Sequence, residues 1–74
     1  MKNIKQQVLD NFTRVARKKV TENDDIKALN IDSLDLAEII VLAEEEFNIS
    51  ISDEELMSLV LVSDVIKLIK SKHE

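Results

Sequence analysis

The segment of the sequence best suited to chemistry is a serine between two acids, Asp32-Ser33-Leu34-Asp35, at the start of a periodic apolar stretch. A helix that begins here presents unpaired N–H groups and partial positive charge, which suit a phosphate ester on the Ser33 hydroxyl. Asp32 and Asp35 would help a modifying enzyme to place a divalent cation. The alternative is purely structural, because serine is also among the best helix N-cap residues. This segment alone leaves both interpretations of Ser33 open.

The composition excludes most other kinds of active site. The chain contains no Cys and no Gly, so it has no thiol nucleophile, no cysteine zinc site, no glycine-rich phosphate loop and no EF-hand loop. Its one histidine, His73, is the penultimate residue, which argues against a Ser-His triad. We therefore expect no metal site in this chain.

Charge is distributed unevenly along the chain. The sequence has 10 Lys+Arg and 15 Asp+Glu, for a net charge of −5. Residues 28–66 hold ten of the acids and no Lys or Arg, whereas the rest holds all ten basic residues and five acids. This acidic centre disfavours nucleic acid as a partner, because phosphates attract basic surfaces. It is either a solvated face or a docking surface for basic partners.

Length and hydropathy limit the number of domains and the possible membrane segments of the protein. With 74 residues, the chain is expected to form one domain over residues 1–74. The polar, periodic N-terminus predicts no signal peptide. The longest uncharged stretch, residues 56–63, is far too short to span a bilayer. We expect a cytoplasmic monomer.

Apolar periodicity predicts an all-α protein, a four-helix bundle with a long loop between the first two helices and a short third helix. The helices are expected over residues 3–19, over residues 34–47, from Ser52 onward, and over residues 63–72. Asn48 replaces the missing glycine as the C-cap of the second helix. Ser52 and Glu55 form a capping box at the start of the third. In the long loop, Ile26 and Leu29 are expected to pack on the core.

The second helix has two apolar faces. One is the expected core stripe of Leu36, Ile39, Ile40, Ala43 and Phe47. On the opposite side, Leu34, Ala37 and Val41 are interleaved with Glu38 and Glu45. An amphipathic helix needs only one apolar stripe, so a second one ringed by carboxylates is typical of a partner-binding helix. The alternative is that these are scattered exposed apolar residues, which are normal on protein surfaces.

Together these residues resemble the acyl carrier protein family. The likeness starts with Asp32-Ser33-Leu34-Asp35 and Glu38. It continues through Ala43-Glu44-Glu45-Glu46-Phe47, Ser52-Asp53-Glu54-Glu55 and Val62-Ser63-Asp64-Val65-Ile66. It covers about residues 26–69 without a gap. An isolated Asp-Ser-Leu is a weak signal, but the acid run at matching spacing makes the resemblance specific.

The resemblance implies a carrier protein that is not an enzyme, and it implies a function for each matching residue. Ser33 would receive 4′-phosphopantetheine from coenzyme A, and Asp32 and Asp35 would be recognised by the holo-carrier synthase that installs this arm. Partner enzymes of fatty acid and lipid synthesis, with basic docking patches, would bind Leu34, Ala37, Glu38, Val41, Glu44 and Glu45. Acyl chains on the arm would enter a pocket near Ile51, Leu59, Val62, Val65 and Ile66.

The sequence also departs from the family pattern. Asn30 stands where the family usually has glycine, and it tolerates the same left-handed backbone. Ser52 replaces a usual proline, and Leu61 replaces a usual threonine. The loop after the first helix is a few residues short. Two alternatives therefore stay open: a carrier of aminoacyl, peptidyl or polyketide cargo, and an unmodified acidic helical interaction module. The Glu44-Glu45-Glu46 run resembles the fatty-acyl branch most.

Overall fold

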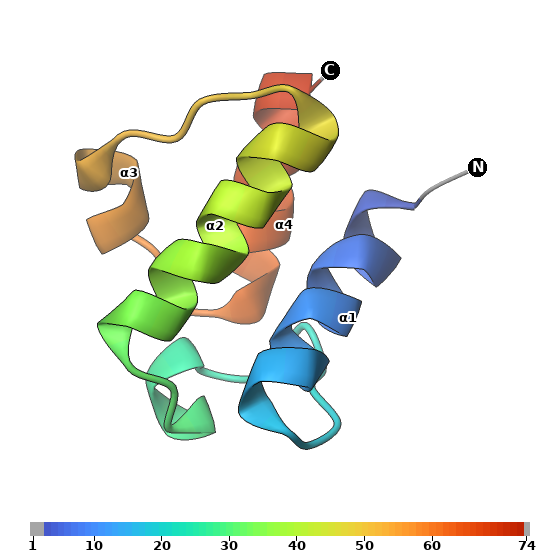
Figure 1. The fold of residues 1–74 in the computed structure, drawn as a ribbon, viewed down its shortest axis with the longest axis vertical. Coiled ribbons are helices and arrows are strands. Elements are labelled where there is room, and N and C mark those ends of the chain that lie inside the picture. Colours follow the sequence, from blue (N-terminus) through green and yellow to red (C-terminus); the bar gives the residue numbers. More distant parts are fainter. Residues whose placement is uncertain (1–2, 74) are drawn as a thin grey trace.

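The computed structural model describes residues 3–73, so residues 1, 2 and 74 of the expected domain lie outside the described part. The elements are α1 (Ile4–Ala16), the 3₁₀ turn η1 (Ile26–Leu29), α2 (Ser33–Phe47), α3 (Asp53–Met57) and α4 (Val62–His73). The prediction of an all-α four-helix bundle with a long first loop and a short third helix is confirmed (Figure 1).

Helix α1 shows how local chemistry sets the helix ends. Asn3 caps it, because its side chain accepts a hydrogen bond from the Lys5 N–H at 2.9 Å. The expected end at Lys19 is wrong. The helix stops at Ala16, because Arg17 adopts the left-handed conformation with φ 60° and its N–H bonds to the Thr13 carbonyl. The basic residues after Arg17 therefore belong to the loop.

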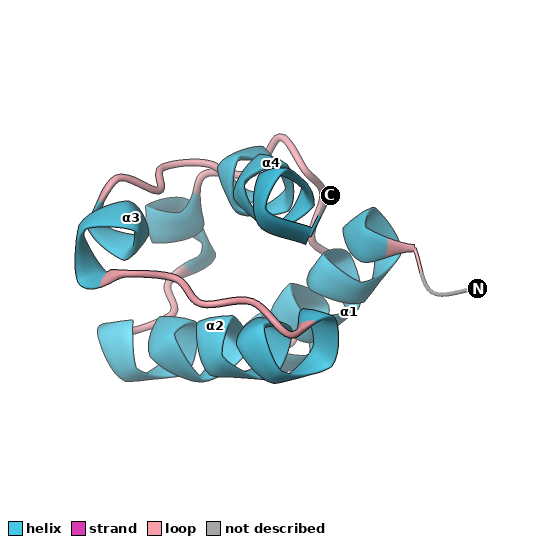
Figure 2. Cartoon of the chain, turned by 90° about the horizontal axis from the view of Figure 1, so that it is seen from above, coloured by secondary structure: helices cyan, strands magenta, loops and turns pink. Residues whose placement is uncertain are grey.

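The core lies between α1, α2 and α4, which make the principal helix contacts. Seen from above, α3 and α4 lie on one side of the bundle and α2 on the other (Figure 2). The buried apolar side chains are Val8, Phe12, Val20, Ile26, Leu29, Ile39, Ile40, Ala43, Phe47, Val62, Val65, Ile66 and Ile69. The expected core stripe of α2 is confirmed except at Leu36, which is half-buried. Each fully buried Phe or Ile stabilises the fold by about 1.5–3 kcal/mol.

The long loop is tied to the segment before α4 by backbone hydrogen bonds. The Ile26 N–H donates to the Val60 carbonyl at 2.9 Å, and the Val62 N–H donates to the Asp24 carbonyl at 3.0 Å. The loop therefore satisfies a donor in the first turn of α4, which has no intrahelical acceptor. Ile26 and Leu29 are buried as expected. The 3₁₀ turn that contains them was not predicted.

The segment between α2 and α3 follows its sequence signals. Asn48 ends α2 in the left-handed conformation with φ 56°, which confirms the predicted C-cap. The capping box is also confirmed, since the Ser52 side chain accepts from the Glu55 N–H and the Glu55 side chain accepts from the Ser52 N–H. None of the residues of α3 is buried, so α3 is the most weakly packed helix of the described chain.

Candidate functional site

Ser33 is the first residue of α2, and it is exposed. In Figure 1, α2 begins at the end of the bundle opposite to the C-terminus. The Ser33 hydroxyl makes no hydrogen bond within the described residues. An exposed hydroxyl at the start of a long helix is open to a modifying enzyme and lies beside unpaired backbone N–H groups.

The N-cap of α2 is Asp32, not Ser33. Asp32 Oδ1 accepts a hydrogen bond from the Asp35 N–H at 2.8 Å, and the Asp32 backbone is extended with ψ 173°. The alternative that Ser33 serves as the N-cap is therefore wrong. Asp and Ser are equally good caps, so the residue that caps depends on where the chain turns.

That turn is set by Asn30. Asn30 has φ 59° and ψ 33°, and its N–H bonds to the Lys27 carbonyl at 3.2 Å. Asparagine accepts this left-handed conformation at low cost, as the sequence predicted. The turn therefore forms with Asn30 in place of glycine, and it leads directly into Asp32 and Ser33.

The outer face of α2 has the predicted mixture of apolar and acidic side chains. Leu34 is 80% exposed and Val41 is 49% exposed. Glu38, between them, and Glu45, one turn beyond Val41, are also exposed, whereas Ala37 is half-buried. This surface offers apolar contact inside a ring of carboxylates, which suits a partner with a basic rim.

Glu44 differs from the other acids of this set. It is half-buried, and its Oε2 accepts a hydrogen bond from the Ile51 N–H at 2.7 Å. Its backbone carbonyl accepts from the N–H groups of Asn48 and Ile49. Glu44 thus holds the loop that follows α2 through both its carboxylate and its backbone carbonyl. No sequence signal predicts this bond, because it joins residues seven apart across a turn.

The residues expected near the acyl chain belong to one apolar cluster. Val62 and Val65 are 0% exposed and Ile66 is 6% exposed, while Ile51 and Leu59 are half-buried against them. These five residues come from α4 and from the segments on either side of α3. An acyl chain among them would have to displace side chains, since Val62, Val65 and Ile66 are already buried.

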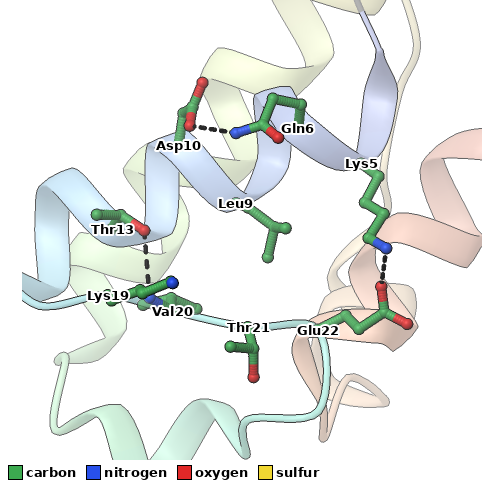
Figure 3. A pocket seen from close by; sticks show the side chains of 9 residues that line it. All are labelled: Lys5, Gln6, Leu9, Asp10, Thr13, Lys19, Val20, Thr21 and Glu22. Carbon is green, nitrogen blue, oxygen red and sulfur yellow. Dashed lines mark hydrogen bonds and ion pairs between the residues drawn. The ribbon is translucent and has the colours of Figure 1, made fainter.

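Three cavities between residues 3 and 73 touch these five residues only at Ile66, which lines one of them. One of about 400 Å³ lies between α1 and the following loop, where Leu9, Thr13 and Val20 line it (Figure 3). The Lys5–Glu22 ion pair lies at its edge (Figure 3). Cavities of about 480 and 250 Å³ adjoin α4. Ser33 lines none of the three.

The carboxyl groups with displaced pKa values also lie away from Ser33. The backbone N–H of Ser52, followed by the ammonium group of Lys72, lowers the pKa of Glu55 below its usual value. The N–H groups of Leu61 and Val60 lower the pKa of Asp64. These groups stabilise the starts of α3 and α4. Between residues 3 and 73, no three His, Asp or Glu side chains are grouped to hold a metal ion.

Comparison with known proteins gives a consistent result. The family model described as "Phosphopantetheine attachment site" matches residues 6–69. An acyl carrier protein homolog of Mycoplasmopsis pulmonis is 39% identical over 71 residues, which are 96% of this chain and 97% of the relative. The acyl carrier protein of Buchnera aphidicola is 39% identical over 69 residues, which are 93% of this chain and 88% of the relative.

The fold agrees with these sequence matches. The crystal structure of an acyl carrier protein from Thermotoga maritima superposes with a TM-score of 0.76 at 26% identity. The superposition covers 93% of this chain and 89% of the other. No helix in the described range is long and apolar enough to cross a membrane.

Proposed function

The chain belongs to the acyl carrier protein family, and from this premise we propose that Ser33 is the residue that bears its 4′-phosphopantetheine arm. The observation that carries the proposal is the exposed hydroxyl at the first residue of α2, directly after the Asp32 cap. When bound, the arm supplies the thiol that holds an acyl group as a thioester. The chain itself contains no cysteine, so it offers no thiol of its own.

Three other serines, Ser52, Ser58 and Ser63, fit the arm less well. The Ser52 and Ser58 hydroxyl oxygens are engaged in hydrogen bonds with Glu55 of α3. Ser63 is half-buried at the start of α4. Only Ser33 stands between two acids at the beginning of a long helix, where Asp32 and Asp35 are available to the holo-carrier synthase.

The test is loading by a holo-carrier synthase with coenzyme A and Mg²⁺, followed by intact mass. The wild-type chain should gain one phosphopantetheine arm, and Ser33→Ala should gain none. Ser52→Ala is the matched control, and it should load like the wild type. An arm on another serine, or a wild-type chain that stays unmodified, would refute the assignment. The unmodified chain would favour the alternative of a purely acidic interaction module.

We further propose that the protein moves cargo between enzymes and has no catalytic residue of its own. Basic patches on acyl-transfer and fatty acid synthesis enzymes would dock on the outer face of α2, where Leu34 and Val41 are exposed between carboxylates. A weak, electrostatically steered interface suits rapid exchange among partners. The protein would act as a monomeric single domain in the cytoplasm.

The acyl chain would be sheltered in the cluster that contains Ile51, Leu59, Val62, Val65 and Ile66. Its aliphatic side chains can part around a chain, and burying six methylenes contributes up to about 5 kcal/mol at roughly 0.8 kcal/mol each. Aminoacyl, peptidyl or polyketide cargo is the alternative. Loading with matched fatty-acyl and aminoacyl ligases distinguishes these cargoes.

A further inference from the structure

One side of the molecule carries exposed positive charges that the proposed function does not use. They come from the end of α1, the loop after it and α4, and they belong to Arg17, Lys18, Lys19, Lys67 and Lys70. None of these five exposed side chains makes an ion pair with another residue between 3 and 73. We call these five residues the basic side, and their charge is available to a partner.

The fold brings the basic side together across two cavities. Lys19 lines the cavity of about 400 Å³ beside α1 (Figure 3), and Lys67 and Lys70 line the one of about 250 Å³. The other two members directly precede Lys19 in the chain. Lys5 and Glu22 line both cavities, so the two cavities adjoin. Because Lys5 and Glu22 form an ion pair, they neutralise each other and leave the surrounding cations in excess.

Three carboxylates near the basic side reduce this excess without removing it. Asp10 lines one of the cavities and accepts a hydrogen bond from Gln6. Asp24 accepts from a backbone N–H of the loop after α1, and Asp64, in the first turn of α4, accepts from the Leu61 N–H. Five cations face three carboxylates, so this side is positive although the whole chain has a net charge of −5.

The outer face of α2 lies across the bundle from the cations of α4. Helices α2 and α4 occupy opposite sides of the bundle (Figure 2), and the Cα atoms extend over 29 × 29 × 18 Å. The Debye length at physiological ionic strength is only about 8 Å. An anionic surface in contact with the basic side is therefore attracted by its cations, while most of the acidic charge of α2 is screened from that surface.

The neighbouring side chains indicate which kind of anionic partner fits. Protein interfaces depend on apolar anchors, but the large apolar side chains that are exposed in the described chain belong to α2, to α3 and to the loop after α3: Leu34, Val41, Met57 and Val60. Single-stranded nucleic acids stack on aromatic side chains, but Phe12 and Phe47 are buried. Anionic lipid headgroups need only clustered Lys and Arg. The basic side therefore fits a lipid surface best.

We propose that the basic side docks this protein on an anionic lipid surface and leaves the outer face of α2 free for its enzyme partners. Docking itself does not need the arm on Ser33, whereas the free face of α2 matters only for the proposed function. Each Lys or Arg that reaches the headgroups tightens binding about fivefold, which corresponds to about 1 kcal/mol. A few such charges give weak, reversible binding, so the protein exchanges between lipid and water.

The first experiment is sedimentation of the full chain with vesicles made of equal parts of phosphatidylglycerol and phosphatidylcholine, or of phosphatidylcholine alone. At about 0.1 M salt, the wild type should bind only the mixed vesicles. Lys19→Gln should weaken this binding about fivefold. The matched control is Lys27→Gln, which removes the charge of another exposed lysine, in η1, outside the basic side. It should change binding less than about twofold.

Ionic strength gives a second criterion. At about 0.01 M salt the Debye length is about 30 Å, which spans the molecule, so the lipid also repels the acids of α2. Binding should therefore be weaker there than at about 0.1 M, and it should be lost at about 1 M, where the Debye length is about 3 Å. Binding that is strongest at the lowest salt would contradict docking through one side.

The orientation is measured by NMR on the ¹⁵N-labelled chain, with mixed vesicles that contain a gadolinium-chelate lipid. The amide signals of Lys18 and Lys67 should broaden more than those of Val41 and Glu45. Equal broadening of all four overturns the orientation, and so do equal effects of Lys19→Gln and Lys27→Gln on vesicle binding.

A chain that binds no vesicle overturns the proposal outright. If polyuridylate or polyglutamate binds with the expected dependence on Lys19 while vesicles do not, the partner is a nucleic acid or an acidic protein, and the lipid proposal is wrong. Neither result touches the arm, because loading is tested at Ser33 by intact mass. A chain that cannot be loaded at Ser33 refutes the proposed function instead and leaves vesicle binding standing.

Discussion

Asp32 and Ser33 are neighbours in the chain, but they have different roles that single substitutions can separate. Asp32 caps α2 through the 2.8 Å bond to the Asp35 N–H, while the Ser33 side chain makes no hydrogen bond within the described residues. Replacing an N-cap Asp by Ala typically costs about 1 kcal/mol. In a domain of this size, that lowers the melting temperature by about 4–8 °C. Asp32→Ala should therefore be measurably less stable.

Ser33→Ala should change stability by less than about 0.5 kcal/mol, because alanine is a good helix former at an exposed position. Asp32→Asn should also remain stable, since Asn caps as well as Asp. The two mild variants should nevertheless differ from wild type in loading. Ser33→Ala should accept no arm, and Asp32→Asn should load more slowly because the synthase loses a charge to recognise.

The assay pairs a thermal melt with the mass-based loading reaction on the three variants. If Ser33→Ala melts as low as Asp32→Ala, the capping geometry described above is incorrect. If Asp32→Asn loads at the wild-type rate, the Asp32 charge has no part in recognition. If Ser33→Ala still gains an arm, Ser33 is not the attachment residue.

Three further outcomes follow from burial, charge and backbone conformation. Ile40 is 4% exposed, so Ile40→Ala should cost about 2–5 kcal/mol in urea unfolding. Val41 is 49% exposed, so Val41→Glu should change the free energy of unfolding by no more than about 0.5 kcal/mol. Similar losses in both variants would contradict the assignment of one buried and one exposed face to α2. The folded pKa of Glu55 lies below its usual value of 4.5, so its stabilisation is present above that pH and lost as the pH falls through the folded value. Glu55→Gln should thus lower the urea midpoint at about pH 7, and this loss should shrink as the pH is lowered below 4.5; a loss that does not change with pH would count against this. Arg17→Gly should raise stability by about 0.5 kcal/mol, since φ is 60° there; a lower melting temperature would contradict it.

The elements that local chemistry specifies were predicted well. Asn48 and the Ser52–Glu55 pair are helix ends that a few neighbouring residues determine, and both have the expected geometry. The core stripe of α2 follows from helical spacing, because one face must be buried. Asn30 was correctly interpreted as a substitute for glycine, since few other residues tolerate a positive φ.

The errors occur where two local signals compete. Asp32 and Ser33 are both strong caps, so the sequence leaves the start of α2 uncertain by one residue. The basic residues after Ala16 are good helix formers, so no neighbouring residue predicts the left-handed conformation of Arg17. The 3₁₀ turn over Ile26–Leu29 depends on hydrogen bonds to a distant segment, such as that from the Ile26 N–H to the Val60 carbonyl.

Glu44 shows what a sequence pattern cannot contain. The resemblance to acyl carrier proteins predicts only a docking role for this residue. Whether the side chain turns to solvent or to the loop depends on where the chain goes after Asn48. The left-handed cap at Asn48 turns the chain back, which brings the Ile51 N–H within 2.7 Å of the Glu44 carboxylate. The half-buried Glu44 carboxylate thereby supports the loop in front of α3, an arrangement that depends on the path of the backbone and not on the acid run itself.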